Sequence, residues 1–519
     1  MRNPAVRQPR NAVRLWWGYL PLVPIVAVFV GMVVVAPSTL PESRADGPVR
    51  EVADAETASG WGATVTACQD RAVQVEGDGY SPPCYAFQGD NGGATSRGVT
   101  SDTITVSYRM NPGEPHLLKV LADLANIPFD ETPEDLVRTA EGLVDYFNQH
   151  FQFYGRQLQL VRVPGSGSVL TELTGGGQDR AANDALKVAD EARAFADITA
   201  FTQPYADALS DHHVVNLGVA YMSREWFTAR RPYAWSNLSD CSVAAESASE
   251  IAGKAILGRP AIYAGGDLDG RTRKLGLIAP NNLEYQQCVE AGTRVLEDAG
   301  YSIDYQTDYV LNLSTITETA RGIIAQLKDN GITSVACACD PLMVMRLAEF
   351  AEQQDYQPEW LVMGVGFTDL DLVGQIIQNG SGQQWSRAFG SSPWAAQQAI
   401  GSTDGYRAYR SVRDDQPSLL VDLLYYQLYQ LAIGVQMAGP DLTPDNFETG
   451  MFSYPEGSGS AGTWDFAPEH YTGVVDYRIF WWDPDIVSQF NGEHGGYRDD
   501  GTRYREGELP PGDLPVFQP

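Results

Sequence analysis

The stretch RKLGLIAPNNLEYQQCVEAGTRVLEDAG, residues 273–300, has the pattern of a buried strand, a tight turn and an amphipathic helix. Strand-to-helix units of this kind build parallel sheets, which place ligands beside the carboxyl ends of their strands. The turn at residues 279–282 lies at such an end. It has neither the G-x-G-x-x-G pattern of dinucleotide-binding proteins nor the G-x-x-x-x-G-K-S/T pattern of P-loop proteins. We therefore expect a Rossmann-like unit without a phosphate-binding loop.

Strand-like and helix-like segments alternate on both sides of this unit. One series runs from Gly98 to about residue 245, and a second runs from Arg273 to Gly364. The irregular stretch at residues 258–273 is too long for a tight connection and falls where a domain boundary is expected. Strands separated by single helices imply parallel sheets with right-handed crossovers. The sequence thus predicts an α/β fold of two Rossmann-like lobes joined by a hinge, with a cleft between them.

The chain has 519 residues, too many for one hydrophobic core, so we expect two or more domains. Its formal net charge is -30, from 36 basic and 66 acidic residues. This charge would repel a phosphate backbone, which argues against a nucleic-acid-binding role. The chain also lacks G-x-S-x-G, H-E-x-x-H and Walker motifs, which argues against an enzyme. We expect no cofactor and no metal ion.

The N-terminus differs from the acidic remainder of the chain. Residues 1–14 contain four arginines, and residues 15–36 carry no charge. At about 1.5 Å per residue the uncharged run spans about 33 Å, enough to cross the hydrocarbon layer of a membrane. We expect a cytoplasmic arm (1–14) and a transmembrane signal-anchor (15–36) in the cell membrane, with the bulk of the chain outside. A cleaved signal peptide is the alternative.

Six cysteines fit an exported protein, in which an even number usually forms disulfides. Cys68 and Cys84 flank a Gly/Pro-rich stretch, and we expect them to close a small loop within a tether that covers residues 37–97. The remaining four allow three pairings: Cys241, Cys288, Cys337 and Cys339. Cys337 and Cys339 lie on one face of a predicted strand, so we expect them to have different partners.

Four segments carry a family resemblance: GVTSDTITVSY (98–108), DITAFTQPYADALSDHHVVNLG (197–218), the opening stretch and GTWDFAPEHYTGVVDYRIFWW (462–482). Together they resemble the branched-chain amino-acid type of periplasmic substrate-binding proteins, which have the type I binding-protein fold. The likeness covers roughly residues 98–485 and is one of pattern and order. It implies a first lobe of residues 98–245 and 365–450, a second lobe of residues 246–364 and 451–490, and a C-terminal tail of residues 491–519.

The resemblance implies an extracytoplasmic solute-binding protein of an ABC-type uptake system, with a membrane permease as its partner. In that family the ligand lies between the lobes, which close on it by a hinge motion. The family's hydroxyl-rich turn is replaced here by Ala200 and Phe201, and Gly366 stands where the family has a carboxylate for the ligand's ammonium group. An unpaired charge in a closed cleft is costly. We therefore expect the small polar solute to be an amide or amino-acid derivative rather than a free amino acid.

Candidate cleft residues follow the predicted strands of both lobes. Arg109 is placed to pair with an anionic ligand group, and Asn281 and Tyr285 follow the strand of the opening stretch. Helix capping is the alternative role for the asparagine, and core packing is the alternative for each aromatic residue. The complete expected set is Tyr108, Arg109, Thr202, Gln203 and Tyr221 from the first lobe, with Asn281, Tyr285 and Asp340 from the second.

Two other functions are compatible with the same pattern. A ligand-sensing module that acts on a membrane partner would need the same two lobes and the same anchor. A two-lobed glycosyltransferase also stacks two Rossmann-like domains, but it would use a cytoplasmic sugar nucleotide. The outward topology expected from the N-terminus opposes that enzyme.

Overall fold

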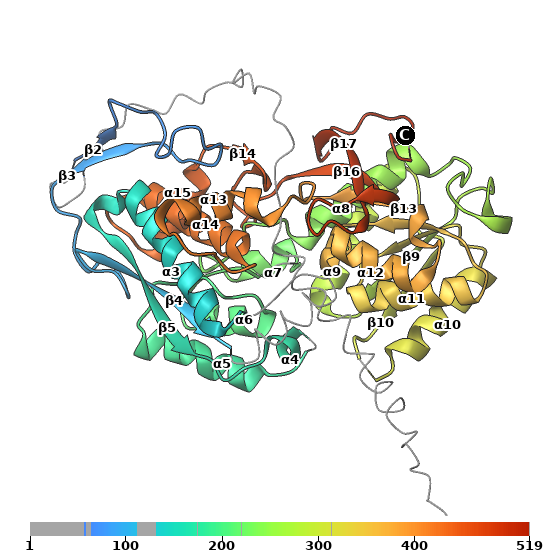
Figure 1. Cartoon of the computed structure of the whole chain (residues 1–519), viewed down its shortest axis with the longest axis horizontal. Coiled ribbons are helices and arrows are strands. Elements are labelled where there is room, and N and C mark those ends of the chain that lie inside the picture. Colours follow the sequence, from blue (N-terminus) through green and yellow to red (C-terminus); the bar gives the residue numbers. More distant parts are fainter. Residues whose placement is uncertain are drawn as a thin grey trace, which may run out of the picture.

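Two mostly parallel β-sheets, one in each of two lobes, form the framework of the molecule (Figure 1). The computed structural model describes residues 57–58, 64–111, 131–173, 175–219, 221–312 and 314–517. Within these residues the predicted two-lobed α/β fold is confirmed. The expected anchor at residues 15–36 lies outside the described part of the chain, and no described helix has the length and apolar character needed to span a membrane.

The first lobe is built on a parallel sheet with the strand order β5-β4-β6-β7-β8. Its strands are β4 (Thr103–Met110), β5 (Gln157–Pro164), β6 (Ala196–Asp197), β7 (Val215–Leu217) and β8 (Ala234–Trp235). The helices that pack together on one side of it are α3 (Pro133–His150), α13 (Asp404–Val412), α14 (Val421–Ala438) and α15 (Pro444–Ser453). The other helices of the lobe are α4 (Val169–Leu173), α5 (Gln178–Leu186), α6 (Gln203–Asp211) and α7 (Arg224–Ala229).

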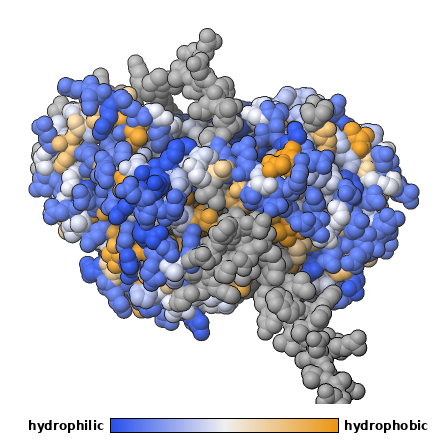
Figure 2. Space-filling view, in the orientation of Figure 1, coloured by the Kyte–Doolittle hydropathy of each residue, from blue (hydrophilic) through white to orange (hydrophobic). Residues whose placement is uncertain are grey.

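The second lobe has a longer sheet, with the strand order β10-β9-β11-β12-β13-β16-β17. Its parallel strands are β9 (Leu275–Pro280), β10 (Tyr305–Tyr309), β11 (Ser334–Cys337), β12 (Glu359–Val362) and β13 (Ala388–Ser392). Antiparallel β16 (Asp476–Val487) and β17 (His494–Arg505) extend it. The helices are α8 (Cys241–Ile251) packed on α9 (Leu283–Asp298), and the series α10 (Ile316–Asp329), α11 (Pro341–Gln353) and α12 (Asp371–Ser381). Figure 2 shows that the visible face of both lobes is mostly hydrophilic.

The opening stretch of the sequence forms the centre of this second lobe. β9 is buried along its whole length, which explains its continuous apolar run. α9 buries residues at helical spacing against α8, namely Cys288, Val289, Ala291, Gly292 and Leu296. The predicted strand, turn and helix are therefore all present, and the turn lies at the carboxyl end of β9.

The chain crosses from one lobe to the other at different residues from those that the resemblance implies. α12 packs on α11 and β17, and β13 pairs with β12, so residues 371–392 belong to the second lobe rather than to the first. α8 also packs on α9, which places the first crossing before residue 241. β17 belongs to the same sheet, so the expected tail is partly a strand. β13 has the sequence AFGSS, whose small residues give little strand signal.

Residues 64–97 are packed on the first lobe, whereas the sequence predicted a tether. β1 (Thr57–Ala58), β2 (Thr64–Ala67) and β3 (Tyr85–Gln88) form a small antiparallel sheet. The loop between Cys68 and Cys84, here called the cystine loop, inserts Tyr80 beside a hairpin of β14 (Gly457–Gly459) and β15 (Gly462–Trp464). The Tyr80 hydroxyl accepts a hydrogen bond from the Ala461 N–H at 2.8 Å and donates one to the Gly462 carbonyl at 2.6 Å. Buried aromatic and polar contacts thus fix a segment whose composition resembles a linker.

The six cysteines form three disulfides. The predicted Cys68–Cys84 bond is confirmed. Cys241 pairs with Cys288 and joins α8 to α9. Cys337 pairs with Cys339, so the expectation that these two have different partners is wrong. β11 ends at Cys337, and the strand alternation on which that expectation rested does not continue to Cys339.

Candidate functional site

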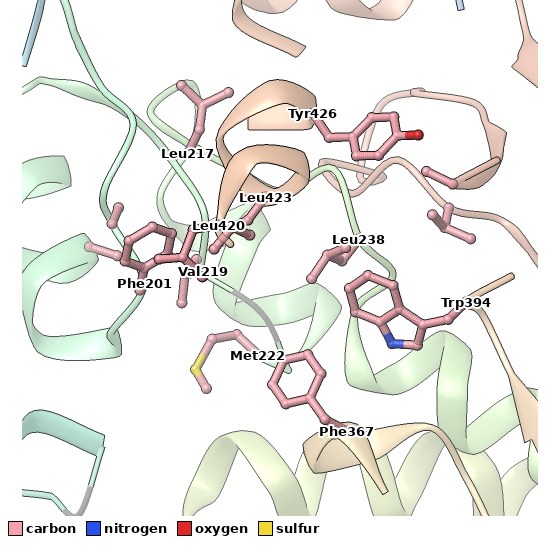
Figure 3. Close-up of a cluster of buried hydrophobic side chains, with 14 of the residues drawn as sticks. Phe201, Leu217, Val219, Met222, Leu238, Phe367, Trp394, Leu420, Leu423 and Tyr426 are labelled. Carbon is pink, nitrogen blue, oxygen red and sulfur yellow. The ribbon is translucent and has the colours of Figure 1, made fainter. Parts of the chain in front are cut away.

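A pocket lies where the two lobes meet, and the described residues that line it come from both of them. Tyr221 and Leu238 line it from the first lobe, and Phe367 and Trp394 line it from the second. Figure 3 shows further buried apolar side chains of the first lobe in the same cluster, here called the apolar wall: Phe201, Val219, Met222, Leu420 and Leu423. We call the space between them the inter-lobe pocket. Its surroundings suit the apolar part of a small molecule.

Two aromatic residues meet across this pocket in unusual backbone conformations. Tyr221 has φ 57° and Phe367 has φ 60°, in the left-handed region that bulky residues rarely adopt. Their rings lie edge to face, with centroids 5.6 Å apart. Such conformations cost about 1–3 kcal/mol each and gather at binding and catalytic sites. The two lobes therefore hold this aromatic pair in place at a cost in backbone strain.

Beside the aromatic pair, the pocket borders buried polar atoms without a hydrogen-bonding partner in the described residues. The Tyr221 hydroxyl is one of them. Asp369 lies behind the pocket residue Gly364, and one of its carboxylate oxygens accepts a hydrogen bond from Ser392 at 2.5 Å, whereas the other has no described partner. Burial raises the pKa of Asp369 to about 6. This acid is part of the second lobe's structure rather than of the pocket's lining.

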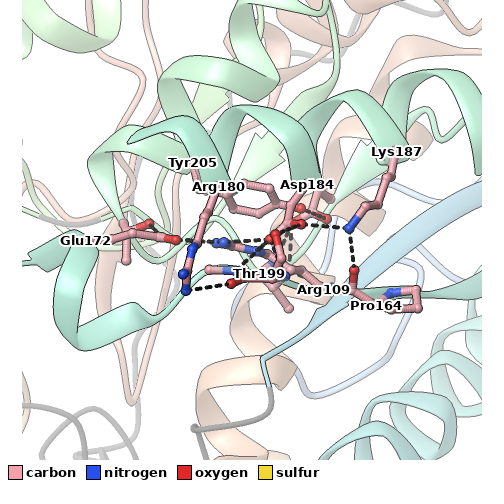
Figure 4. A network of polar contacts seen from close by, with 12 residues as sticks. Arg109, Pro164, Glu172, Arg180, Asp184, Lys187, Thr199 and Tyr205 are labelled. Atoms are coloured by element: carbon pink, nitrogen blue, oxygen red, sulfur yellow. Dashed lines mark hydrogen bonds and ion pairs between the residues drawn. The ribbon is translucent and has the colours of Figure 1, made fainter. Parts of the chain in front are cut away.

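Arg109, expected to face an anionic ligand group, instead pairs with the chain's own carboxylates (Figure 4). It is 1% exposed. Its guanidinium donates to Glu172 at 2.6 and 3.0 Å and to Asp184 at 3.0 Å, and it lies 4.2 Å from the centre of the Tyr205 ring. Burial opposes the charge of Arg109, but the two carboxylates outweigh it and raise the pKa of the guanidinium. The guanidinium thus serves the buried carboxylates of Glu172 and Asp184, and Arg109 is not among the residues that line the inter-lobe pocket.

Three consecutive residues at the start of α6 have three different roles. Phe201 belongs to the apolar wall. Thr202 is the N-cap of α6, and its hydroxyl donates to Glu172 at 2.5 Å. The side-chain amide of Gln203 reaches the second lobe and donates to Glu284 in α9 at 3.0 Å. The start of α6 therefore contributes to the apolar wall, to the buried ion pair and to the contact between the lobes.

The other expected residues are dispersed. Tyr108 is 1% exposed in the core of the first lobe. The Asn281 side chain is exposed, while its backbone N–H donates to the Tyr309 carbonyl. Asp340 is the N-cap of α11 and accepts hydrogen bonds from the Met343 N–H and the Tyr309 hydroxyl. Tyr285 lines a separate apolar cavity beneath α8 and α9. Of the eight expected residues, only Tyr221 lines the inter-lobe pocket.

Sequence reasoning missed most of the pocket's lining. Trp394 of the lining stands out as a tryptophan in a Gly/Ser-rich segment, and Phe201 of the apolar wall departs from a hydroxyl-rich turn. Leu238 and Phe367 have no local signal, because an apolar residue in a pocket has the same sequence pattern as one in the core. Glu172 was also missed. No cluster of metal-ligating side chains occurs among the described residues.

Comparison with known proteins finds no matching protein-family model and no matching curated protein. Solved structures do match. One is a solute binding protein of an ABC transporter from Rhodopseudomonas palustris HaA2 in complex with p-hydroxybenzoic acid, with a TM-score of 0.54 and 10% identity over 78% of this chain and 98% of that one. The chain has the fold of ABC-transporter solute-binding proteins.

Two further structures with this fold support the same conclusion. A substrate binding protein from Aeropyrum pernix has a TM-score of 0.52 and 14% identity over 78% of this chain and 96% of that chain. A fatty acid ABC transporter substrate-binding protein from Thermomonospora curvata has a TM-score of 0.51 and 13% identity over 79% of this chain and 95% of that chain. The resemblance to periplasmic binding proteins is thus confirmed at the level of the fold, and identities this low carry no ligand assignment.

Proposed function

We propose that this protein is an extracytoplasmic solute-binding protein of an ABC-type uptake system, and that it binds its solute reversibly in the inter-lobe pocket without turnover. The observation that carries the proposal is the pocket itself, whose described lining comes from both lobes of a binding-protein fold. A ligand drives lobe closure only if it binds the closed form better than the open one, which requires contacts on both sides. Tyr221 and Leu238 supply one side, and Phe367 and Trp394 the other.

The solute in this proposal has a mainly apolar body, in contrast to the amide or amino-acid derivative expected from the sequence. The pocket and the apolar wall present aromatic rings and aliphatic chains, which stabilise a ligand by removing its apolar surface from water. Two proteins of the same fold are described with p-hydroxybenzoic acid and with fatty acid transport, so the fold accommodates solutes with apolar bodies. A free amino acid would find few partners for its two charges here.

The proposed partner is a membrane permease that receives the solute, and residues 15–36 are the proposed membrane anchor. The three disulfides support a location outside the cytoplasm, where such bonds persist. Mass spectrometry of the mature N-terminus tests the anchor. A new terminus between Ala36 and Asp46 in a soluble protein would contradict it.

Thermal unfolding in the presence of a solute panel tests the function. The panel contains aromatic alcohols, aromatic acids, fatty acids and amides, with amino acids and sugars for comparison. A solute at a hundredfold its Kd should stabilise the protein by about 2.7 kcal/mol and should be recovered chemically intact. Trp394→Ala should abolish the shift, whereas Val487→Ala, a change at a residue that is 55% exposed and outside the pocket, should leave it unchanged. Consumption of the solute would contradict a binding protein.

A further inference from the structure

The amino end of α6 has the donors that a carboxylate ligand needs. Thr202 is its N-cap, but the hydroxyl does not accept a hydrogen bond from the helix and is free to donate elsewhere. The Arg109 guanidinium points to the same place. A hydroxyl, a guanidinium fork and a helix N-terminus together attract anions, because each presents N–H or O–H groups or positive charge.

Glu172 occupies this position from within the chain. Its carboxylate accepts two hydrogen bonds from Arg109, at 2.6 and 3.0 Å, and one from Thr202 at 2.5 Å. The side chain of Glu172 is 0% exposed. A Cβ atom at Gly167 would lie 2.2 Å from a Glu172 oxygen and 1.9 Å from an Arg109 nitrogen, so the loop at Gly167 closes over the pair in a way only glycine permits. The anion position is therefore both filled and sealed.

The chain itself connects the filled position to the apolar wall, which belongs to the same cluster of buried side chains as the pocket residues Leu238, Phe367 and Trp394. Phe201, immediately before Thr202, belongs to the apolar wall. The described residues that line the pocket include no lysine, arginine or histidine. They include one carboxylate, Asp240, which accepts hydrogen bonds from the Val243 N–H and the Thr472 hydroxyl. A charged solute would thus lose its hydration without gaining a counter-charge from these residues.

Neutral hydrogen-bonding groups are available beside the same apolar surface. The Tyr221 hydroxyl is buried without a described partner. The amide of Gln427 in α14 is 0% exposed, and neither its oxygen nor its nitrogen has a described partner. The Gln427 side-chain nitrogen lies 2.7 Å from the position that a Cβ atom would take at Gly218. The neighbours of Gly218 in the chain, Leu217 and Val219, belong to the cluster of buried apolar side chains in Figure 3. An amide and a phenol of this kind recognise hydroxyl and carbonyl groups without needing charge.

We infer that the inter-lobe pocket selects an uncharged solute, an aromatic or aliphatic body with a hydroxyl or carbonyl group, because Glu172 takes the place of a ligand carboxylate. The inference rests on the function proposed above. It makes Glu172 a specificity-determining residue that acts without touching the solute, and it assigns Tyr221 and Gln427 as the polar contacts.

Matched pairs of neutral and anionic probes test the selectivity. Benzamide and benzoate share one ring and differ in charge, as do octanamide and octanoate. In calorimetric titrations of the full chain, the amide of each pair should bind at least about tenfold more tightly than the carboxylate. Tighter binding of the carboxylates would overturn the inference and leave the proposed function standing. Absence of binding by every solute in the wider panel would instead overturn the proposed function.

Glu172→Ala tests the filled anion position independently of any solute. Removing the internal carboxylate should leave Arg109 and Thr202 open to an added one, so sodium acetate should raise the unfolding temperature of the variant relative to sodium chloride at equal ionic strength. The parent and Glu141→Ala, which removes an exposed partner of Arg162, should show no such difference. If Glu172→Ala folds only with acetate present, the inference is supported. If acetate has no effect while Glu172→Gln folds, the position is not an anion site.

Discussion

The side-chain amide of Gln203 in the first lobe donates a hydrogen bond to the Glu284 carboxylate in the second lobe, with 3.0 Å between nitrogen and oxygen. A second bond joins the lobes nearby, from the Ser223 hydroxyl to the Gln287 side-chain oxygen at 2.5 Å. Both acceptors lie on α9, in the opening stretch of the sequence. The turn whose purpose the sequence left open thus leads into a helix that holds the lobes together.

We predict that Gln203→Ala shifts the protein toward an open form. Loss of one hydrogen bond to a charged group costs about 1.5–3 kcal/mol, so solute affinity should fall by roughly tenfold or more. Titration calorimetry measures the affinity, and small-angle scattering measures the change in shape. Gln353→Ala, which removes a bond within α11 to Glu349, is the matched control and should alter neither. Equal effects of the two changes would show that the inter-lobe bond has no role in closure.

Removal of the buried guanidinium should destabilise the first lobe severely. Arg109→Ala leaves Glu172 and Asp184 buried without their counter-charge, and breaking a buried pair in this way costs about 3–5 kcal/mol. Urea unfolding measures the loss. Arg162→Ala removes an arginine that is 48% exposed and paired with Glu141, and should cost less than about 1 kcal/mol. A parent-like stability for Arg109→Ala would mean that the network is not formed in solution.

The Tyr80 hydroxyl should contribute measurably to stability. Tyr80→Phe keeps the ring beside Trp464 but leaves the buried Ala461 N–H and Gly462 carbonyl without their partner. A lost partner of this kind costs about 1–3 kcal/mol. Tyr85→Phe in β3 is the control, and chemical denaturation compares the two variants. Similar small losses in both would contradict the docking of the cystine loop.

Two buried aspartates should make the protein less stable as the pH rises. Burial raises the pKa of Asp369 to about 6 and that of Asp422 to about 7. Because both values lie above the ordinary pKa of about 3.9, the folded state holds more protons than the unfolded state between pH 4 and 7. The stability that these protons supply is complete below about pH 4 and is lost as the pH rises through 6 to 7.

Asp422→Asn isolates one of these contributions. The amide keeps the shape of the carboxyl group and cannot ionise, so the variant should gain stability over the parent above pH 7 and little at pH 4. The gain should be on the order of 1.4 kcal/mol for each unit by which the pKa is raised. Unfolding curves from pH 4 to 8 measure it. Parallel curves for parent and variant would show that Asp422 titrates normally.

The sequence predicts the elements of this fold far better than it predicts the pocket. The 273–300 stretch shows its strand and helix locally, through a continuous apolar run and then a helical period. The Cys68–Cys84 bond was likewise expected from spacing. Tyr221, Phe367 and Trp394 line the pocket from distant parts of the chain and from both lobes, so their convergence depends on how the lobes pack together.

The sequence also does not reveal which charged residues pair with each other, as the buried ion pair of Arg109 and Glu172 shows. Arg109 and Glu172 lie 63 residues apart, and nothing near either one reveals its partner. Read alone, the arginine at the end of a first strand indicates a ligand anion. Only the fold shows that the chain supplies this anion itself. A charged residue that is expected to be buried therefore indicates that a counter-charge is present. The sequence does not say whether a ligand or another residue supplies it.

The packing of residues 64–97 on the first lobe limits how far the lobes can lie from the proposed membrane anchor. Because β1 is paired with β2, the anchor proposed at residues 15–36 would lie no farther from β1 than the fully stretched length of residues 37–56, about 70 Å at ~3.3–3.6 Å per residue. With that anchor, this limit would keep the binding lobes at high local concentration near the membrane surface. Delivery of solute to a neighbouring permease would then depend on orientation rather than on diffusion from the bulk.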